Sequence, residues 1–380
     1  MTDYTKSLIA LRSLRSEHHA QHKDPKILMA TWHLGKRCNY DCSYCSPSIH
    51  DWISPHMPLS KVKAFVDQLD TWMIQQDRKF HIAMSGGEPF IHPDIVEICK
   101  TIKGAETAGD LFTAITNGSL PVDLYTDSLE YLNHLTISLH LERSIKETEK
   151  TLETARILTH LFPEHWINVQ VMCLPGKFDF LDKTVLPFLD QNKIKYTIRR
   201  IRPWINEVVE EWQSPKREIL KTVYDTVWLA KQREQEKKYL DSNLTRIYSE
   251  EQYYSKEELI WLQSKVPTTM WQNIGLWSDD GNYFETNSDI IVNNNKNNFN
   301  GWRCWIGIDS IMIDFDGMIY KSVCRTDGAI GTVDGPIAWP TTPTVCPKQW
   351  CISNVDQTVR KSLPNYMHLV SNTKTNQQIK

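Results

Sequence analysis

Residues 27–45 read ILMATWHLGKRCNYDCSYC, an apolar run that ends in three closely spaced cysteines. The nine residues of 27–35 are mostly apolar or aromatic, which predicts a buried β-strand. Cys38, Cys42 and Cys45 follow it with C-x3-C-x2-C spacing. The stretch therefore predicts a strand that delivers three thiols to a loop at its carboxyl end.

Strand-like and helix-like segments alternate beyond this stretch. Further strands are predicted at 80–86, 111–118, 134–140, 167–176 and 195–201. Helices are predicted at 92–103, 121–132, 144–162 and 180–191. Strands separated by helices favour βα units and a parallel sheet, which gives an α/β fold. A sheet of this kind curls towards a barrel, with its chemistry at the carboxyl ends of the strands.

The pattern changes twice after the last of these strands. The sequence around 214–265 is charged and helix-rich, whereas short strands and glycine-containing turns begin near 302. We expect five segments on this basis. They are a polar helical lead-in at 1–26, the barrel at 27–204, a helical connector at 205–300, a small β-hairpin domain at 301–355 and a tail at 356–380.

Charge and hydropathy exclude several classes of partner. The 380 residues carry a formal net charge of −3, which gives no electrostatic footprint for nucleic acid or an anionic membrane. No apolar run reaches the roughly 18 residues that span a bilayer, and the N-terminus lacks the pattern of a signal peptide. We therefore expect a cytoplasmic protein that binds neither nucleic acid nor membrane.

The nine cysteines are grouped rather than scattered. Structural disulfides are rare in the cytosol, so two groups at opposite ends of the chain favour two metal sites. Three thiolates hold three irons of a [4Fe–4S] cluster and leave the fourth iron open to a chelating small molecule. A zinc loop is the alternative, with His33 or His50 as the fourth ligand.

The first cysteine group resembles the signature of the radical S-adenosylmethionine (SAM) superfamily, C-x3-C-x-aromatic-C after the first strand. The resemblance implies that the α/β fold is a partial (β/α)6 TIM-like barrel. Cys38, Cys42, Tyr44 and Cys45 match it. The resemblance implies that SAM binds the open iron, and that reductive cleavage gives a 5′-deoxyadenosyl radical that abstracts a substrate hydrogen atom. It also places Tyr44 beside the adenine.

Further motifs follow the later strands. Gly86, Gly87 and Glu88 resemble the family's Gly-Gly-Glu motif, since glycine permits close backbone approach and a carboxylate suits the SAM ammonium group. An ordinary turn is the alternative. Other candidates for SAM binding at strand ends are Asn117, Ser138, His140 and Met172. Arg199 and Arg202 end the last strand, where guanidinium groups suit the SAM carboxylate or an acidic substrate group.

The second cysteine group comprises Cys304, Cys324, Cys346 and Cys351. Asp316-Gly317 predicts a β-hairpin between the first two. Four thiolates ligate a second [4Fe–4S] cluster completely, and zinc is the alternative. The segment resembles the SPASM/twitch extension of radical SAM enzymes in its short form with one auxiliary cluster, although the spacing after the hairpin glycine departs from that pattern.

The resemblance implies two kinds of chemistry. An auxiliary cluster oxidises the substrate radical in some such enzymes, whereas others return a hydrogen atom, for which Cys173 is the candidate donor. We expect oxidation of a small molecule such as a sugar, cyclitol or nucleoside, with a flavodoxin- or ferredoxin-type electron donor. The alternatives are a maturase or epimerase of a ribosomally made peptide and, in a different class, a zinc-binding interaction protein.

Overall fold

The computed structural model describes most of the expected barrel and hairpin segments. The described residues are 17–21, 26–42, 44–45, 50–201, 253–265, 273–278, 283–288, 291, 297–348, 351 and 353–362. Arg202 lies outside them, as do 363–380 of the predicted tail.

The larger of the two sheets contains the strands predicted for the barrel. Its strand order among the described residues is β13-β12-β11-β2-β3-β4-β5-β6-β7. The bounds are β2 Ile27–Gly35, β3 Lys79–Gly86, β4 Ala108–Thr116, β5 His134–His140, β6 Trp166–Cys173, β7 Lys195–Arg200, β11 Ser310–Ile313, β12 Met318–Tyr320 and β13 Ala329–Thr332. Strands β2 to β7 are parallel neighbours in chain order. The six predicted strands and the α/β parallel sheet are confirmed.

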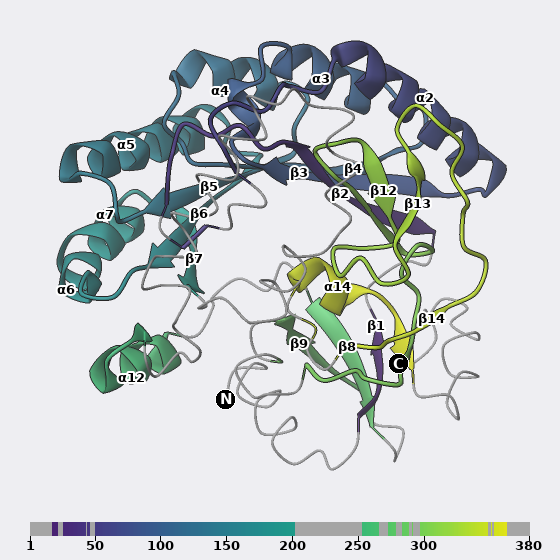
Figure 1. Cartoon of the computed structure of the whole chain (residues 1–380). Helices are drawn as coiled ribbons and strands as arrows, with labels where there is room; N and C mark the ends of the chain where they lie inside the picture. Colours follow the sequence, from purple (N-terminus) through teal and green to yellow (C-terminus); the bar gives the residue numbers. More distant parts are fainter. Residues whose placement is uncertain are drawn as a thin grey trace.

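Helices cover one face of this sheet. Figure 1 shows them as an outer arc around the curved strands. Their bounds are α2 Leu59–Gln75, η1 Pro89–Ile91, α3 Ile95–Lys103, α4 Val122–Leu129, α5 Ile145–Leu161, α6 Phe178–Phe180, η2 Leu181–Val185 and α7 Leu186–Gln191. Helix α5 begins at a capping box in which Ser144 and Glu147 satisfy each other's backbone N–H groups.

Helix α2 is a helix that the sequence interpretation missed. Its buried residues Val62, Phe65, Val66, Leu69 and Met73 recur at helical spacing. This apolar stripe at helical spacing is the sequence pattern that would have predicted the helix. With α2 in place, each step from β2 to β6 is a strand followed by a helix.

The C-terminal hairpin is confirmed, but it joins the barrel sheet. Strand β11 pairs in parallel with β2, and β12 returns antiparallel to β11. Gly317 takes a φ of 83° at the turn, where its N–H donates to Asp314 O at 2.9 Å. The hairpin therefore extends the barrel at the edge where the first strand lies.

A second sheet has the order β14-β10-β15-β1-β8-β9 among the described residues. The bounds of its strands are β1 Glu17–Gln21, β8 Asn273–Ser278, β9 Tyr283–Asn287, β10 Arg303–Cys304, β14 Thr344–Val345 and β15 Lys361–Ser362. Helix α12, Lys256–Ser264, precedes β8 in the sequence, and helix α14, Asn354–Thr358, precedes β15. The sequence predicted a helical lead-in at 1–26, but residues 17–21 of it form strand β1, which pairs with β8 and β15. The helix prediction is wrong for these residues. The connector is likewise helical only in part, since it supplies β8 and β9. Long-range pairing, rather than local propensity, decides these segments.

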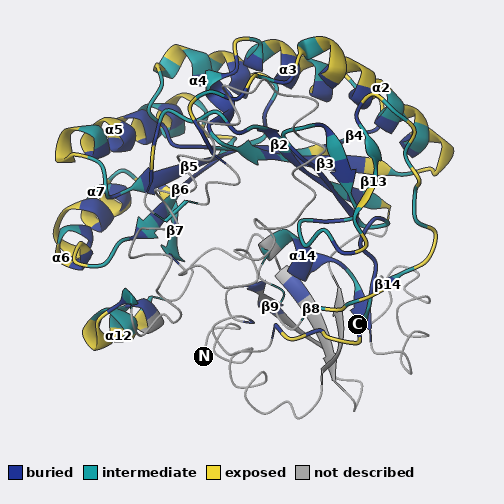
Figure 2. Ribbon diagram, viewed as in Figure 1, coloured by how far each residue is buried: buried dark blue, intermediate teal, exposed yellow. Residues whose placement is uncertain are grey.

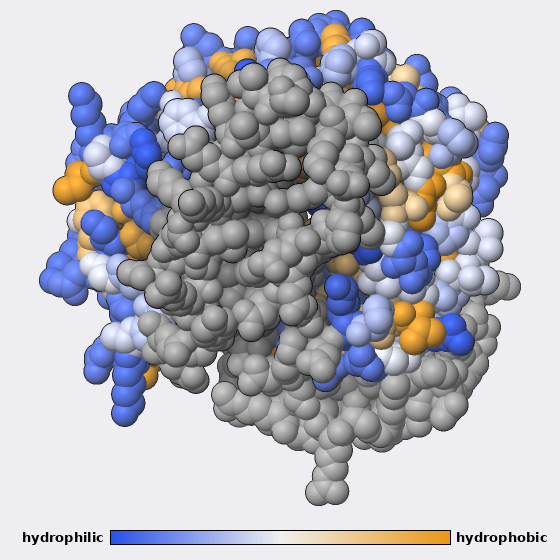
Figure 3. All heavy atoms as spheres, in the orientation of Figure 1, coloured by the Kyte–Doolittle hydropathy of each residue, from blue (hydrophilic) through white to orange (hydrophobic). Residues whose placement is uncertain are grey.

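The core lies between the helices and the barrel sheet. In Figure 2 the helices are buried towards the strands and exposed outwards. Trp32 of β2 meets Phe65 of α2 edge-on, with ring centroids 5.1 Å apart. Hydrophilic residues predominate over the outer helices in Figure 3. Among the described helices, none is both long and apolar enough for a membrane span.

We predict that Phe65→Ala lowers the free energy of unfolding by about 3–5 kcal/mol, because it leaves a cavity beside Trp32. Urea unfolding followed by circular dichroism measures this loss. Ile74→Ala on the same helix is the control, since Ile74 is 51% exposed, and its effect should stay within about 0.5 kcal/mol. Equal losses in the two variants would contradict the packing described for α2.

Candidate active site

The first cysteine loop is held by a buried aspartate. Cys38 N–H donates to Asp51 O at 2.7 Å, and Asp51 N–H donates to Lys36 O at 2.8 Å. The fully buried Asp51 carboxylate accepts the N–H groups of Ile53 and Ser54 at 2.9 and 2.7 Å. Residues 50–54 thus fix the start of the loop.

The Gly-Gly-Glu turn packs directly on the cysteine loop. Gly87 N–H donates to Gly35 O at 2.8 Å, and Glu88 N–H donates to Arg37 O at 2.8 Å. A Cβ on Gly86 would lie 2.4 Å from Gly35 O, and one on Gly87 would lie 2.3 Å from Arg37 O. The chain's own cysteine loop is therefore the backbone that requires both glycines.

Glu88 joins the ends of β3 and β4. Its carboxylate is 3% exposed and accepts hydrogen bonds from Thr116 Oγ1 at 2.8 Å, Asn117 N at 2.6 Å and Phe90 N at 3.1 Å. Burial raises the pKa of Glu88 to about 7, against the lowering effect of these donors. The carboxylate is engaged within the chain, and its predicted contact with the SAM ammonium group remains a prediction.

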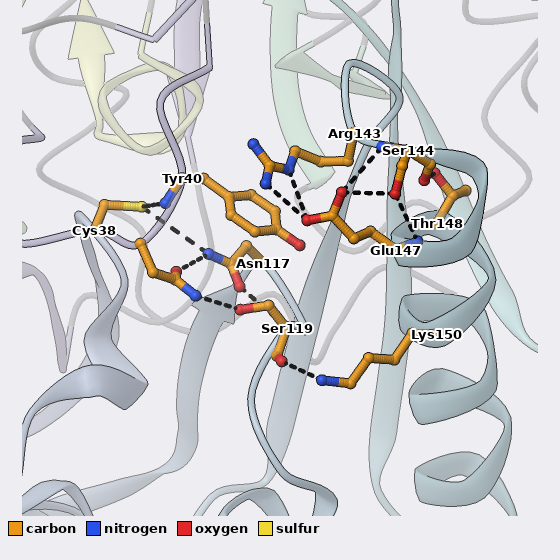
Figure 4. Close-up of polar contacts among 10 residues, drawn as sticks. Cys38, Tyr40, Asn117, Ser119, Arg143, Ser144, Glu147, Thr148 and Lys150 are labelled. Carbon is orange, nitrogen blue, oxygen red and sulfur yellow. Dashed lines mark hydrogen bonds and ion pairs between the residues drawn. The ribbon is translucent and has the colours of Figure 1, made fainter.

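Asn117 lies against the cysteine loop (Figure 4). Its Nδ2 donates to Asn39 Oδ1 at 2.8 Å and lies 4.0 Å from Cys38 Sγ. Tyr40 N–H donates to Cys38 Sγ at 3.3 Å, and Asn39 Nδ2 donates to Ser119 Oγ at 2.8 Å. N–H donors directed at a sulfur suit a metal-bound thiolate. Two N–H groups therefore lie near Cys38 Sγ, an arrangement that is compatible with an iron–sulfur ligand.

The three thiols influence one another. Burial raises the pKa of Cys38 to about 11 and that of Cys42 to about 12, and it raises the pKa of Cys45 well above the usual thiol range. The charges of Cys42 and Cys38 add to the rise at Cys45. Without a metal these thiols stay protonated near neutral pH, so metal binding there releases protons.

Tyr44 and His140 form a pair beside Cys42. Tyr44 OH lies 2.7 Å from His140 Nδ1, the two rings stack with centroids 5.9 Å apart, and Cys42 Sγ lies 3.3 Å from the same nitrogen. Burial, followed by the charge of Arg143, lowers the pKa of His140 to about 4. A neutral imidazole therefore lies within hydrogen-bonding distance of the Tyr44 hydroxyl beside the cysteine loop.

Three of the predicted site residues form one row across the sheet. His140, Met172 and Arg199 are register partners at the carboxyl ends of β5, β6 and β7. Arg199 Nε donates to Gln170 Oε1 at 3.1 Å, and Gln170 Nε2 lies 3.5 Å from Met172 Sδ. Ser138 is buried two residues before His140, so it lies on the same face. The sheet brings these candidates together as one surface.

Cys173 lies on the other face. It follows Met172 directly on β6, so its side chain projects to the opposite side. The thiol is fully buried in the hydrophobic core, and burial raises its pKa to about 12. This position offers no support for a hydrogen donor to the row that contains Met172. Arg202 lies outside the described residues.

The four cysteines of the second group lie in one region of the structure. Cys304 of β10 is buried in an apolar cluster against which Cys324 packs. Cys346 N–H donates to Trp302 O and Cys351 N–H to Asn297 O, both at 2.8 Å. Burial first, and then the charges of Cys324 and Cys346 among others, raise the pKa of Cys304 to about 12. The four thiols thus lie within electrostatic range of one another.

Asp314 forms a bridge of polar contacts between the hairpin and the barrel. His33 Nδ1 of β2 lies 3.3 Å from Asp314 Oδ1, and Arg325 pairs with Asp314 Oδ2 at 2.5 Å. Burial acts to raise the pKa of Asp314, but His33 and Arg325 hold it below the usual value. Arg325 adjoins Cys324 of the second cysteine group, and His33 precedes the first cysteine loop. The bridge therefore connects residues next to both cysteine groups.

In neither group do the side chains converge on a point. Among the described residues, no three His, Cys, Asp or Glu side chains are grouped to hold a metal ion. The ligand sets therefore remain predictions. The sequence interpretation assigned no role to Asp51, Asn39 and Asp314, which position these loops. Of the three, only Asp314 could have been found from the sequence, because it lies at the predicted hairpin turn.

We predict that Glu88→Gln becomes more stable relative to the natural chain as pH rises. The pKa of Glu88 is about 7 in the folded chain, against an ordinary value of 4.5. The folded state therefore holds this proton more tightly than the unfolded state, and the stability that this provides below pH 4.5 is lost as pH rises towards 7. Urea unfolding at pH 5 and pH 8 measures the difference between the two proteins. Glu130→Gln, at an exposed helix end, is the control. A Glu88→Gln difference that is equal at both pH values would contradict the burial effect.

Comparison with known proteins gives partial matches. The GTP 3′,8-cyclase of Crocosphaera subtropica is 27% identical over 167 residues, 42% of this chain and 47% of that protein. GTP 3′,8-cyclase 1 of Mycobacterium tuberculosis (strain H37Rv) is 36% identical over 108 residues, 27% of this chain and 29% of that protein. The chain thus spans less than half the length of these relatives.

The solved structure of Streptococcus suis SuiB has a TM-score of 0.41 and 12% identity, over 78% of this chain and 60% of that one. At that score the likeness establishes neither fold nor function. The family match is more specific, because residues 32–178 match the radical SAM superfamily. They include the cysteine loop, the Gly-Gly-Glu turn and the strands that carry His140 and Met172. Residues 32–178 of this chain are therefore a radical SAM superfamily domain.

Proposed function

We propose that this chain is a radical SAM enzyme whose Cys38, Cys42 and Cys45 hold a [4Fe–4S] cluster. The observation that carries the proposal is the packing of the loop that bears these thiols against the Gly-Gly-Glu turn, with Asn117 beside Cys38, within a radical SAM domain. Held there and reduced by an external electron donor, such a cluster would supply the electron for cleavage of SAM to methionine and a 5′-deoxyadenosyl radical, the species that would take a hydrogen atom from the substrate.

In this proposal, the residues around the cysteine loop position the cluster ligands and SAM. Asp51 and the Gly-Gly-Glu backbone fix the loop, while the N–H groups of Tyr40 and Asn117 face Cys38 Sγ. The row of His140, Met172 and Arg199 offers a neutral imidazole, an apolar thioether and a guanidinium. These groups suit the ribose, the adenine and the carboxylate of SAM, respectively.

We further propose that the four C-terminal cysteines hold an auxiliary [4Fe–4S] cluster that accepts an electron from the substrate radical. The reaction is then an oxidation of a small molecule, such as a sugar, cyclitol or nucleoside, with a flavodoxin- or ferredoxin-type donor. The names of the partial relatives, GTP 3′,8-cyclase and S-adenosylmethionine-dependent nucleotide dehydratase, favour a nucleoside-type substrate within this set.

Anaerobic reconstitution tests the proposal. Two such clusters correspond to about eight irons per chain, and SAM with reductant should give 5′-deoxyadenosine. A protein that takes up zinc and never cleaves SAM would support the zinc-binding interaction protein instead. Solvent deuterium in the product would favour an epimerase, including a peptide epimerase, over an oxidation.

We predict that Cys304→Ala separates the two cysteine groups. The variant should lose about half the iron and all product formation, yet still cleave SAM without coupling to substrate. Cys42→Ala should lose SAM cleavage altogether. Iron analysis and chromatography of 5′-deoxyadenosine measure these effects, and Cys99→Ala, in the buried core of α3, is the control. Loss of SAM cleavage in Cys304→Ala would contradict separate roles.

A further inference from the structure

The inner face of the barrel sheet is polar where β5, β6 and β7 run side by side. Alternation along β6 turns Val169 and Val171 towards the helices, and it turns Asn168 the other way, onto the concave side of the curved sheet (Figure 1). Thr136 of β5 and Thr197 of β7 are buried beside it on the same side. In a closed barrel, valine, isoleucine and leucine fill the corresponding layers. These strands therefore offer hydrogen-bonding groups where apolar packing is usual.

The side-chain amide of Asn168 is only half satisfied. The residue is 3% exposed, and its Nδ2 donates to Thr197 Oγ1 at 3.3 Å. Its Oδ1 is buried and has no hydrogen-bond partner among the described residues. Turning the amide over would pair Oδ1 with the threonine hydroxyl and leave Nδ2 without a partner instead. In either orientation, one end of a buried amide lacks a partner, which costs free energy that a bound polar group would offset.

A second buried polar atom on the inner face has the same property. Thr31 lies on β2 between Ala30 and Trp32, which belong to the core on the helix side, so its hydroxyl projects to the inner side. Thr31 is 7% exposed, and its Oγ1 has no hydrogen-bond partner within the described part of the chain. Three strands separate β2 from β6 in the sheet, so the two atoms arise independently. Together they indicate a face that receives a polar ligand.

The cations on this side of β7 are engaged elsewhere. Lys195 is the β7 partner of Asn168, but its Nζ lies 3.8 Å from the centre of the Trp166 ring, towards the amino ends of the strands. Arg199 Nε donates to Gln170 Oε1 at 3.1 Å, nearer the carboxyl ends. An uncharged ligand group therefore suits Asn168 better than a phosphate or a carboxylate. A hydroxyl suits it best, because a hydroxyl can donate to Oδ1 or accept from Nδ2.

We propose that Asn168 binds the uncharged, hydroxyl-bearing part of the substrate on the inner face of the barrel. The inference rests on the proposed function and deepens it, because it names the residue that recognises the sugar, cyclitol or nucleoside. Asn168 lies four residues before Met172 on β6, which is about 13 Å along a strand. The contact is therefore deeper in the barrel than the row assigned to SAM, and Asn168 determines specificity rather than cleavage of SAM.

Removal of the amide tests whether it serves the fold or a ligand. Asn168→Leu introduces an apolar side chain of similar size in the full chain, and urea unfolding gives the midpoint. We expect an unchanged or higher midpoint, because the substitution removes a buried polar atom that lacks a partner. Asn133→Leu is the matched control, since Asn133 Oδ1 accepts from Phe112 N at 3.2 Å, and its midpoint should fall. An equal fall in Asn168→Leu would overturn the proposal, because Asn168 would then be structural.

Binding of small polar probes is the second readout. Guanosine, myo-inositol and glucose represent the three substrate classes, and equilibrium dialysis against the reconstituted chain with SAM gives the Kd of each. Asn168→Leu should weaken the probe that binds best by about tenfold or more. Equal affinity in the variant would mean that the amide binds only water, and this result would overturn the proposal. A parallel loss of SAM affinity would also overturn it, since Asn168 would then belong to the SAM site.

Formation of 5′-deoxyadenosine separates this inference from the proposed function. If the natural chain forms it from SAM and reductant but binds none of the three probes, the role of Asn168 is wrong and the radical SAM activity stands. If the natural chain forms none, the proposed function itself is wrong.

Discussion

Two backbone hydrogen bonds, from Gly87 to Gly35 O and from Glu88 to Arg37 O, hold the candidate site together. They lock the end of β3 onto the cysteine loop that follows β2, and side chains at either glycine would break that contact. Glu88 then carries the constraint to β4 through Thr116 and Asn117. The start of the cysteine loop is therefore held by the ends of three neighbouring strands.

The hairpin places the second cysteine group relative to this loop. Because β11 is a parallel neighbour of β2, the turn after β11 lies at the same end of the sheet as the first cysteines. Asp314 at that turn binds His33 on one side and Arg325 on the other. The sequence shows the hairpin clearly, but nothing local in it indicates which strand it joins, since sheet edges are chosen by long-range packing.

The barrel strands were predictable because parallel strands buried on both faces appear as short apolar runs. The same reasoning fails where pairing decides the structure, as at β1, which looks polar and helical in isolation. Burial of polar groups is equally hidden: Asp51 and Lys361 look like surface residues in the sequence, and only the folded chain shows what surrounds them. Cys173 illustrates the converse, because alternation along β6 turns it into the core.

The two cysteine groups differ in the charges that act most strongly on their thiols. After burial, the strongest charge acting on Cys38 is Glu88 and on Cys45 it is Cys42, both of which disfavour a thiolate. At Cys304 and Cys351 the strongest charge is Lys361, which favours one. Lys361 stands opposite Cys304 in the paired strands β10 and β15, so the sign of the nearest charge at the second group follows from strand pairing rather than from the cysteine spacing.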